Sequence, residues 1–434
     1  MPIFVDPETN ESYNDSQIAV DHPHVGLVLD HLNALDKAGD PPSATLIDEE
    51  PRLSLGLIGL ADVQATKQKF VEEFGEARLS DPVPVSTLDW VLNGLRYSIK
   101  QKHGPWLPDF GKDRDAESVG GLPHIGTGGD GYAGLADGME ILPEDEENEA
   151  KGKYVRVGVI DTEMSRHPLL EDRWYTLESS SVLAVHDTGG EDGHPWLQGH
   201  MAFVSGLILR RAPAAKLEVR GVLHGDVPKA SVWEVARAMA DFLTSGVSLI
   251  NLSIGCQTSD NKPPFVLKRA VDVLNQNGIL LIAAAGNNGV AGVSTSPRFN
   301  APIFPGACPG AVAVGAVDEH HGHSAASFSS VGPWVSLVGP GVNVVSTYLI
   351  GKVRFYQVTG LPEPPPPEEF HGVASWSGTS FAAATVTGEI ASRMVPGRNT
   401  ARGVLAELLD QKDLAQHKGI GRYEAPQPYE APQP

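Results

Sequence analysis

Four polar residues between positions 161 and 380 have the side chains that acyl transfer requires. One serine, Ser380, lies in the stretch "ASWSGTSFAAATVTG", whose small residues would let a helix pack closely and another backbone approach the hydroxyl. Asp161 follows the apolar run "YVRVGVI", His200 begins an apolar helical pattern in "GHMAFVSG", and Asn287 follows "ILLIAAAG". A serine hydroxyl becomes a good nucleophile when an imidazole takes its proton, a carboxylate orients the imidazole, and fixed donors bind the oxyanion. The set therefore predicts nucleophilic catalysis at a carbonyl carbon.

The elements around these residues predict how they come together. Short apolar runs rich in β-branched residues recur as "YVRVGVI", "LEVRGVL", "VSLINLSI", "ILLIAAAG" and "AVAVGAV". Helical patterns lie between several of them, as in "SVWEVARAMADFLTSG" and "PPFVLKRAVDVLNQNG". This alternation predicts an α/β fold with three layers, a mostly parallel sheet with helices on both faces. Reactive groups gather at the carboxyl ends of parallel strands, which is where most of the four residues fall.

The order of these blocks resembles a known family. Residues 154–394 look like a subtilisin-like serine protease domain of the subtilase family. In this chain "VGVIDTEMSRHP" resembles the family's aspartate block and "GHMAFVSG" its histidine block. Likewise, "AAAGNNG" resembles its oxyanion block and "SGTSFAAATVTG" its serine block. The chain order Asp, His, Ser is also that of subtilisin. The long segment before the serine block, which starts at "AVGAVDEHHGHS", is similar as well.

The resemblance implies a role for each motif residue. Asp161 would orient the histidine, His200 would act as general base and acid, and Ser380 would be the nucleophile. The Asn287 side chain and the Ser380 backbone N–H would bind the oxyanion. Ile303 would lie near the base of the specificity pocket and favour modest apolar side chains. Two walls would bind the substrate, with residues Ser253, Ile254, Gly255, Ala284, Ala285 and Gly286.

The chain departs from the family pattern at several positions. Met201 and Ala202 stand where the family usually has Gly and Thr, Glu163 stands in place of Gly, and Ala384 in place of Pro. Met201 is bulky enough to narrow access to the histidine. The family's calcium loop is missing after the histidine helix, so no metal and no cofactor are predicted. The segment of residues 347–375 is longer than is usual in the family and contains the run "LPEPPPPEE", which suggests a flap near the active site.

Composition excludes several classes of function. The chain has 434 residues and a net charge of −21, which would repel phosphate backbones and argues against nucleic acid as a partner. Its most apolar stretch is much shorter than a membrane span, and the first residues lack a secretory pattern. The sequence therefore predicts a cytoplasmic protein. Its two cysteines, Cys256 and Cys308, are expected to be buried thiols, and the histidines of "DEHHGHS" a solvated loop.

The first part of the chain has a different character. Helical patterns near residues 61–76 and 86–102 predict an α/β or mostly helical region over residues 1–140, either a prosegment or a permanent recognition domain. An acidic linker (141–153), the peptidase domain (154–412) and a disordered Pro-rich tail (413–434) would follow. The polyproline run and the repeated "YEAPQP" of the tail favour spacers, with docking of a partner protein as the alternative.

These patterns favour a serine endopeptidase that cuts a protein or peptide, with processing of a specific intracellular substrate as one form of that role. Enzymes of the sedolisin type use glutamate in place of histidine and aspartate in place of the oxyanion asparagine, so His200 and Asn287 argue against them. The alternative to an enzyme is a catalytically silent module with the subtilisin fold that binds or regulates another molecule.

Overall fold

The computed structural model describes residues 3–6, 11–118, 134–135, 149–177, 182, 193–225, 228–289, 299–318, 325–356, 363–410 and 420–422. The chain forms two compact units, and the boundary does not follow the order of the sequence. Unit 1 contains residues 1–116, 230–240 and 258–273, and unit 2 contains residues 117–229, 241–257 and 274–434. Two helices that interrupt the second half of the chain therefore belong to unit 1.

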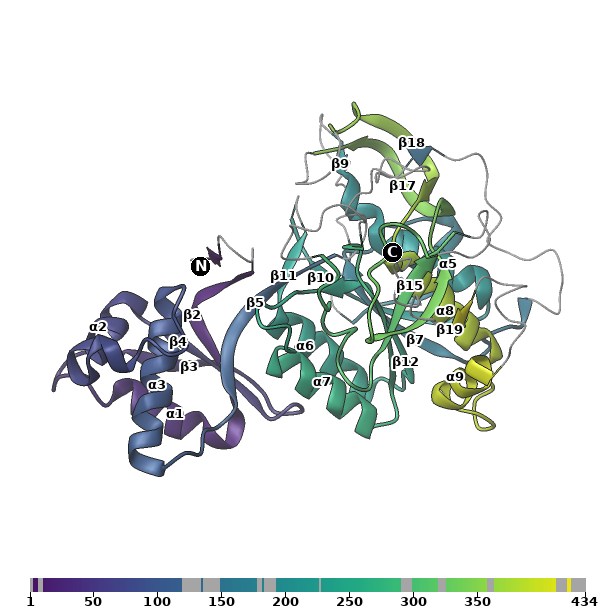
Figure 1. Ribbon diagram of the computed structural model, residues 1–434. Helices are drawn as coiled ribbons and strands as arrows, with labels where there is room; N and C mark the ends of the chain where they lie inside the picture. The colour runs from purple at the N-terminus through teal and green to yellow at the C-terminus, as the bar shows by residue number, and fades with distance from the viewer. Residues whose placement is uncertain are drawn as a thin grey trace, which may run out of the picture. The chain divides into compact units, whose positions relative to one another are not determined.

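Unit 2 is built on an eight-stranded sheet that holds the predicted apolar runs (Figure 1). Its strands follow the order β19-β16-β15-β14-β12-β7-β10-β8. All neighbours are parallel except β19 and β16. The bounds are β7 (Arg156–Thr162), β8 (Trp174–Tyr175), β10 (Lys216–Leu223), β12 (Leu249–Leu252), β14 (Leu280–Ala284), β15 (Val312–Val317), β16 (Val335–Pro340) and β19 (Gly421–Arg422). Strands β12, β14 and β15 are buried along their whole length, as strands covered on both faces are.

Two helices of unit 2 carry the histidine and the serine. They are α5 (His200–Arg211) and α8 (Thr379–Arg393), and both contribute to one large apolar core with the sheet. Small residues let them approach closely, because a Cβ at Gly388 would lie 2.7 Å from the carbonyl oxygen of Ile208. The parallel sheet and its helices confirm the predicted fold class. A third helix, α9 (Ala401–Asp410), follows α8.

A second, four-stranded sheet of unit 2 contains the described parts of the segment predicted as a flap, of which residues 357–362 lie outside the described residues. Its order is β6-β18-β17-β9, with β6 (Gly134–Leu135), β9 (His194–Pro195), β17 (Val344–Arg354) and β18 (Glu368–Trp376). Hydrogen bonds from β17 tie it to α5 and to the turn before it. Ser346 Oγ donates to Phe203 O, and Tyr348 Oη to Trp196 O, each at 2.6 Å. The base of this hairpin is therefore fixed to the histidine helix; the flap role stays a prediction.

Unit 1 contains an antiparallel sheet of order β11-β5-β2-β4-β3, with β1 also paired to β2. Its strands are β1 (Ile3–Val5), β2 (Ser12–Asp21), β3 (Ala44–Glu50), β4 (Leu55–Leu60), β5 (Phe110–Ser118) and β11 (Lys229–Ser231). Its helices are α1 (Val25–Asn33), α2 (Val63–Phe74), α3 (Thr87–His103), α6 (Val232–Asp241) and α7 (Phe265–Gln276). The two predicted helices are present as α2 and α3, and Ser86 and Asp89 form a capping box at the start of α3. The N-terminal region therefore contains both strands and helices and is not mostly helical.

The end of the chain differs from the expected disordered tail at three residues. Gly421 and Arg422 form β19 against β16, and Ile420 is fully buried in the core of unit 2. A single apolar side chain with a place in the core is enough to fix this short strand, and the Pro-rich composition around it hides that signal. The rest of the predicted tail, most of the acidic linker and most of the "DEHHGHS" stretch lie outside the described residues. Within the described ranges, no helix is long and apolar enough to cross a membrane.

Candidate active site

Asp161 and His200 meet at the carboxyl end of the parallel sheet. Asp161 is the penultimate residue of β7, and His200 is the first residue of α5; both side chains are fully buried. His200 Nδ1 lies 2.7 Å from Asp161 Oδ1 and 2.8 Å from Oδ2. The Thr162 backbone N–H donates to Oδ1 at 2.7 Å and holds the carboxylate in place. A carboxylate accepts only, so the imidazole proton is assigned to Nδ1, which leaves Nε2 as the proton acceptor.

Ser380 is the second residue of α8 and is also fully buried. Ser380 Oγ and His200 Nε2 are both buried atoms without a hydrogen-bond partner among the described residues. Buried polar atoms in native proteins almost always have a partner, and a catalytic role is one of the reasons why such an atom lacks one. These two atoms are the ones that would exchange a proton during catalysis. Catalytic hydrogen bonds are often unformed before substrate binds.

Aromatic side chains enclose the histidine. The Trp376 ring meets the His200 ring edge-on, with centroids 5.5 Å apart, and the Phe381 ring lies 5.4 Å from it. Phe203 contacts both aromatic residues. This apolar shell strengthens the electrostatic interaction between Asp161 and His200, because it excludes water from them.

A chain of hydrogen bonds fixes the serine helix to β12. Thr387 Oγ1 donates to Asn251 Oδ1 at 3.0 Å, and Asn251 Nδ2 donates to Ser253 Oγ at 3.2 Å. Ser253 Oγ in turn donates to the carbonyl oxygen of Ser380 at 3.4 Å. Ser380 is thus held against the first of the two predicted substrate walls.

Asn287 is positioned by the residue that precedes the nucleophile. Its Oδ1 accepts from Thr379 N at 2.9 Å and from Thr379 Oγ1 at 2.8 Å, and Gly286 N donates to Thr379 Oγ1 at 3.2 Å. With Oδ1 engaged on α8, Nδ2 is the branch of the amide that can donate elsewhere. It lies beside Gly378, where a Cβ would be 3.6 Å from it. An amide held in this way suits an oxyanion donor. Sequence reasoning assigned no role to Thr379, although its position next to Ser380 in "SGTS" was the available signal.

Replacing Asn287 with Ala is expected to lower kcat by about 10²- to 10³-fold with little change in KM, because the lost donor acts on charge that develops in the transition state. That range is known for the oxyanion asparagine of subtilisin itself. Steady-state kinetics on a peptide substrate measures it. Thr379→Val, which removes the hydroxyl contact and keeps the amide, separates loss of the donor from loss of its support. Asn288→Ala is the neighbouring control; an Asn287→Ala enzyme as fast as this control would contradict the assignment.

Ile303 and Phe304 connect residues at the two predicted substrate walls. On one side is β13 (Ile254–Gly255), whose neighbour Cys256 exchanges two backbone hydrogen bonds of 2.9 Å with Phe304. On the other side are Ala284 and Gly286, and Ile303 packs against Ala284. A Cβ at Gly286 would lie 2.5 Å from Ile303 Cγ1, so Ile303 fills the space beside this glycine. Ile303 thus contacts one predicted wall, and its place near the base of a specificity pocket stays a prediction.

Ile303→Ala is expected to shift cleavage toward larger apolar side chains before the scissile bond, because about three carbon atoms of space open beside Gly286. Competing peptides that carry Ala or Phe at that position measure the change as a ratio of kcat/KM. The expected shift is about 10- to 100-fold in favour of Phe, since each buried CH₂ contributes about 0.8 kcal/mol. An unchanged ratio would place Ile303 outside the pocket.

The residues that depart from the family pattern have structural explanations. Met201 and Ala384 are fully buried in the core of unit 2 and so are not on an open approach to the histidine. Glu163 lies 3.6 Å from His224. Cys256 and Cys308 are both buried and reduced, as predicted. Among the described residues, no group of three or more His, Cys, Asp or Glu side chains could hold a metal ion.

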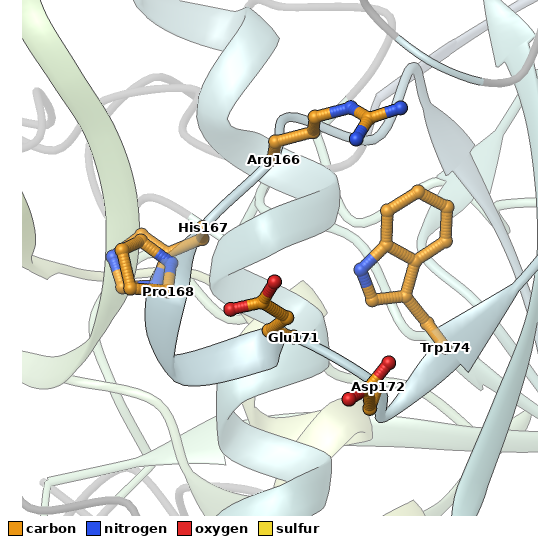
Figure 2. A pocket seen from close by; sticks show the side chains of 6 residues that line it. All are labelled: Arg166, His167, Pro168, Glu171, Asp172 and Trp174. Carbon is orange, nitrogen blue, oxygen red and sulfur yellow. The ribbon is translucent and has the colours of Figure 1, made fainter.

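A separate hollow of about 510 Å³ lies between the loop after β7 and β8, and none of the catalytic candidates lines it (Figure 2). Its lining is Arg166, His167, Pro168, Glu171, Asp172 and Trp174. His167 is buried, with Nε2 at 2.8 Å from Gly372 O and Nδ1 accepting from Leu169 N, and burial lowers its pKa. These bonds make His167 a structural link between this loop and β18.

Comparison with known proteins agrees with this geometry. The family model described as the subtilase family matches residues 152–395. The chain is similar to the thermostable alkaline protease of Halalkalibacterium halodurans, at 34% identity over 45% of this chain and 50% of that protein. It is also similar to subtilisin BL of Lederbergia lenta, at 32% identity over 45% of this chain and 67% of that protein. The match thus spans only about half to two thirds of these relatives.

Among solved structures, fervidolysin from Fervidobacterium pennivorans is similar in fold, with a TM-score of 0.56, 19% identity, and coverage of 88% of this chain and 55% of that one. The chain belongs to the subtilase family.

Proposed function

We propose that this protein is a serine endopeptidase that hydrolyses peptide bonds in protein or peptide substrates. The observation that carries the proposal is the buried contact between Asp161 and His200, at 2.7 and 2.8 Å. The His200 ring also lies 5.4 Å from the ring of Phe381, the residue that follows Ser380 at the start of α8. Subtilase family membership and the names of the relatives, which are proteases, support it.

The reaction follows from the roles of these groups. His200 Nε2 takes the proton of Ser380 Oγ, which attacks the peptide carbonyl carbon. The Nδ2 of Asn287 and the Ser380 backbone N–H bind the oxyanion. His200 then donates its proton to the leaving amine, which departs as the acyl-enzyme forms. In the second half of the reaction a water gives a proton to His200 and attacks the acyl carbon. His200 then returns this proton to Ser380 Oγ as the bond between the acyl group and the serine breaks and the carboxylic acid product leaves.

We also propose that residues 1–118 act as a prosegment rather than a permanent recognition domain. The last two residues of β5, Glu117 and Ser118, belong to unit 2 and pair antiparallel with Gly255 and Ile254 of β13, the predicted substrate wall. An added strand on this wall is how an extended substrate would bind. If β13 has this role, the chain's own segment takes the place of the residues before a scissile bond, which supports the proposal. Under this proposal self-cleavage occurs on the carboxyl side of Ser118, well before the acidic run.

Intact-mass measurements on the purified protein, with fluorescent casein as substrate, test both proposals. The wild type is expected to lose an N-terminal fragment that ends after Ser118 and then to cleave casein, whereas Ser380→Ala keeps its 46.1 kDa mass and is inactive. Casein cleavage without trimming would reject the prosegment alone.

One observation favours the alternative of a silent module. His200 and Ser380 are both fully buried in the described structure, and no hydrogen bond joins them. If neither self-cleavage nor casein cleavage occurs at any pH from 5 to 10, the binding module becomes the better account. The cytoplasmic location, the absence of nucleic-acid and membrane partners, and the docking role of the Pro-rich segments stay predictions.

A further inference from the structure

A buried carboxylate of unit 1 faces the start of helix α6. Asp113 lies on β5 and is only 2% exposed. Its Oδ1 accepts from the backbone N–H of Trp233, in the first turn of α6, at 3.1 Å. The side chain of Ser231, on β11, also hydrogen-bonds to it. Both partners come from residues 229–241, a segment more than 100 positions away along the chain, so this contact exists only while the N-terminal region is docked on α6.

No cation compensates this carboxylate among the described residues. The cations of β5 are engaged elsewhere, Lys112 with Asp89 at 2.8 Å and Arg114 with Glu11. The charged groups that face Asp113 are both acidic, Asp115 on its own strand and Glu234 on α6. Burial, with a smaller contribution from these two carboxylates, raises the pKa of Asp113 from its usual 3.8 to about 7.

A neighbouring aspartate shows the opposite arrangement. Asp48 of β3 also binds α6, but it accepts from Arg237 Nη1 at 2.7 Å and from Trp233 Nε1 at 3.0 Å. Its side chain is 36% exposed. The N-terminal region therefore docks on α6 through two carboxylates. Asp48 is paired with the cation of Arg237, whereas Asp113 has no cation beside it among the described residues.

We propose that Asp113 is a proton-dependent latch that holds the N-terminal region on helix α6 and weakens this docking as the solution becomes alkaline. This inference rests on the prosegment role proposed above, to which it adds a mode of release. A protonated Asp113 is neutral and loses little on burial, whereas an ionised one would be buried without a cation.

The direction of the effect follows from proton linkage. The docked state has the raised pKa, so docking takes up a proton when the solution lies between the two pKa values. The stabilisation is complete below about pH 4 and is lost as the pH rises through about 7. In this window the docking constant falls about tenfold for each pH unit, so it falls about 100-fold between pH 5 and 7 and then becomes constant. After self-cleavage, an alkaline medium would favour departure of the prosegment.

Amide hydrogen exchange of the full chain tests the latch without using catalysis. The protein carries Ser380→Ala so that it stays uncut, and exchange at the Trp233 amide is followed from pH 5 to 8.5 and corrected for intrinsic rates. Protection of this amide is expected to fall about 100-fold between pH 5 and 7 and to level off above. Asp113→Asn, which resembles the protonated acid, is expected to show high protection and no slope. Asp48→Asn is the matched control, with lower protection and an unchanged slope.

The outcomes separate the latch from the prosegment role. A wild-type protection factor that does not change with pH overturns the latch, whatever the Asp113→Asn variant does. Loss of the slope in Asp48→Asn as well would show a general charge effect and would also overturn it. The intact-mass experiment decides the prosegment role independently, since self-cleavage there does not depend on the pH response of Trp233.

Discussion

Replacing Ser380 with Ala is expected to lower kcat on a peptide substrate by about 10⁶-fold, and His200→Ala by a similar factor. These magnitudes are those known for subtilisin, a member of the same family. The reason is that, in the proposed mechanism, Ser380 Oγ and His200 Nε2 act as one unit, the nucleophile and the acceptor of its proton. The double variant is therefore expected to be no slower than either single variant. Steady-state kinetics with active-site-normalised enzyme measures all three.

Ser377→Ala is the matched control for this prediction. Ser377 lies three residues before the nucleophile, and its hydroxyl accepts from the backbone N–H of Asn343 at 2.9 Å. Its removal is expected to change kcat by less than about threefold. A Ser380→Ala protein that retained more than a thousandth of wild-type activity, after contaminating proteases are excluded with the double variant, would contradict the assignment of the nucleophile.

Asp161→Asn is expected to lower kcat by about 10⁴-fold with a small change in KM, as the same substitution does in serine proteases of another fold. Both carboxylate oxygens of Asp161 lie within 2.8 Å of His200 Nδ1 and select the tautomer with the proton on that nitrogen. An asparagine amide would present its NH₂ group to Nδ1 and move the proton to Nε2. His200 could then no longer accept the proton of Ser380.

Proton NMR gives a second readout for this variant. The hydrogen-bonded Nδ1 proton of His200 is expected at low field in the wild type and to be absent in Asp161→Asn. Glu163→Gln, two residues further along and paired with His224, is the control and is expected to keep both the resonance and the activity. Full activity in Asp161→Asn would show that another group orients the histidine.

The sequence was most informative where burial is uniform. The strands of unit 2 are short apolar runs, so their positions could be read directly, and the rule that reactive groups collect at the carboxyl ends of parallel strands brought Asp161 and His200 together. Asn287 was found in the same way, whereas Ser380 was proposed from the small residues that surround it in "ASWSGTSFAAATVTG". Their chemistry depends on residue type and strand order, both of which the sequence contains.

Other features could not be read from the sequence because they depend on contacts between distant segments. The unit 1 strands β2 and β5 are "SYNDSQIAVD" and "FGKDRDAES", which carry many polar residues and lack a clear alternating pattern. The buried carboxylate of Asp113 accepts a hydrogen bond from the backbone N–H of Trp233, which lies 120 positions away along the chain. The pairing of β5 with β13 is set by tertiary structure and has no sequence signal of its own.

Labelling with a fluorophosphonate probe tests the central claim most directly, because the probe reacts only with a serine whose proton is removed by a working base and whose oxyanion is stabilised. The full chain and its self-cleaved product would each be treated, and the modified residue located by peptide mapping. The account predicts one adduct, on Ser380, that is absent from Ser380→Ala and His200→Ala and present in Ser377→Ala. No adduct on either form of the protein, or an adduct on a different serine, would contradict it.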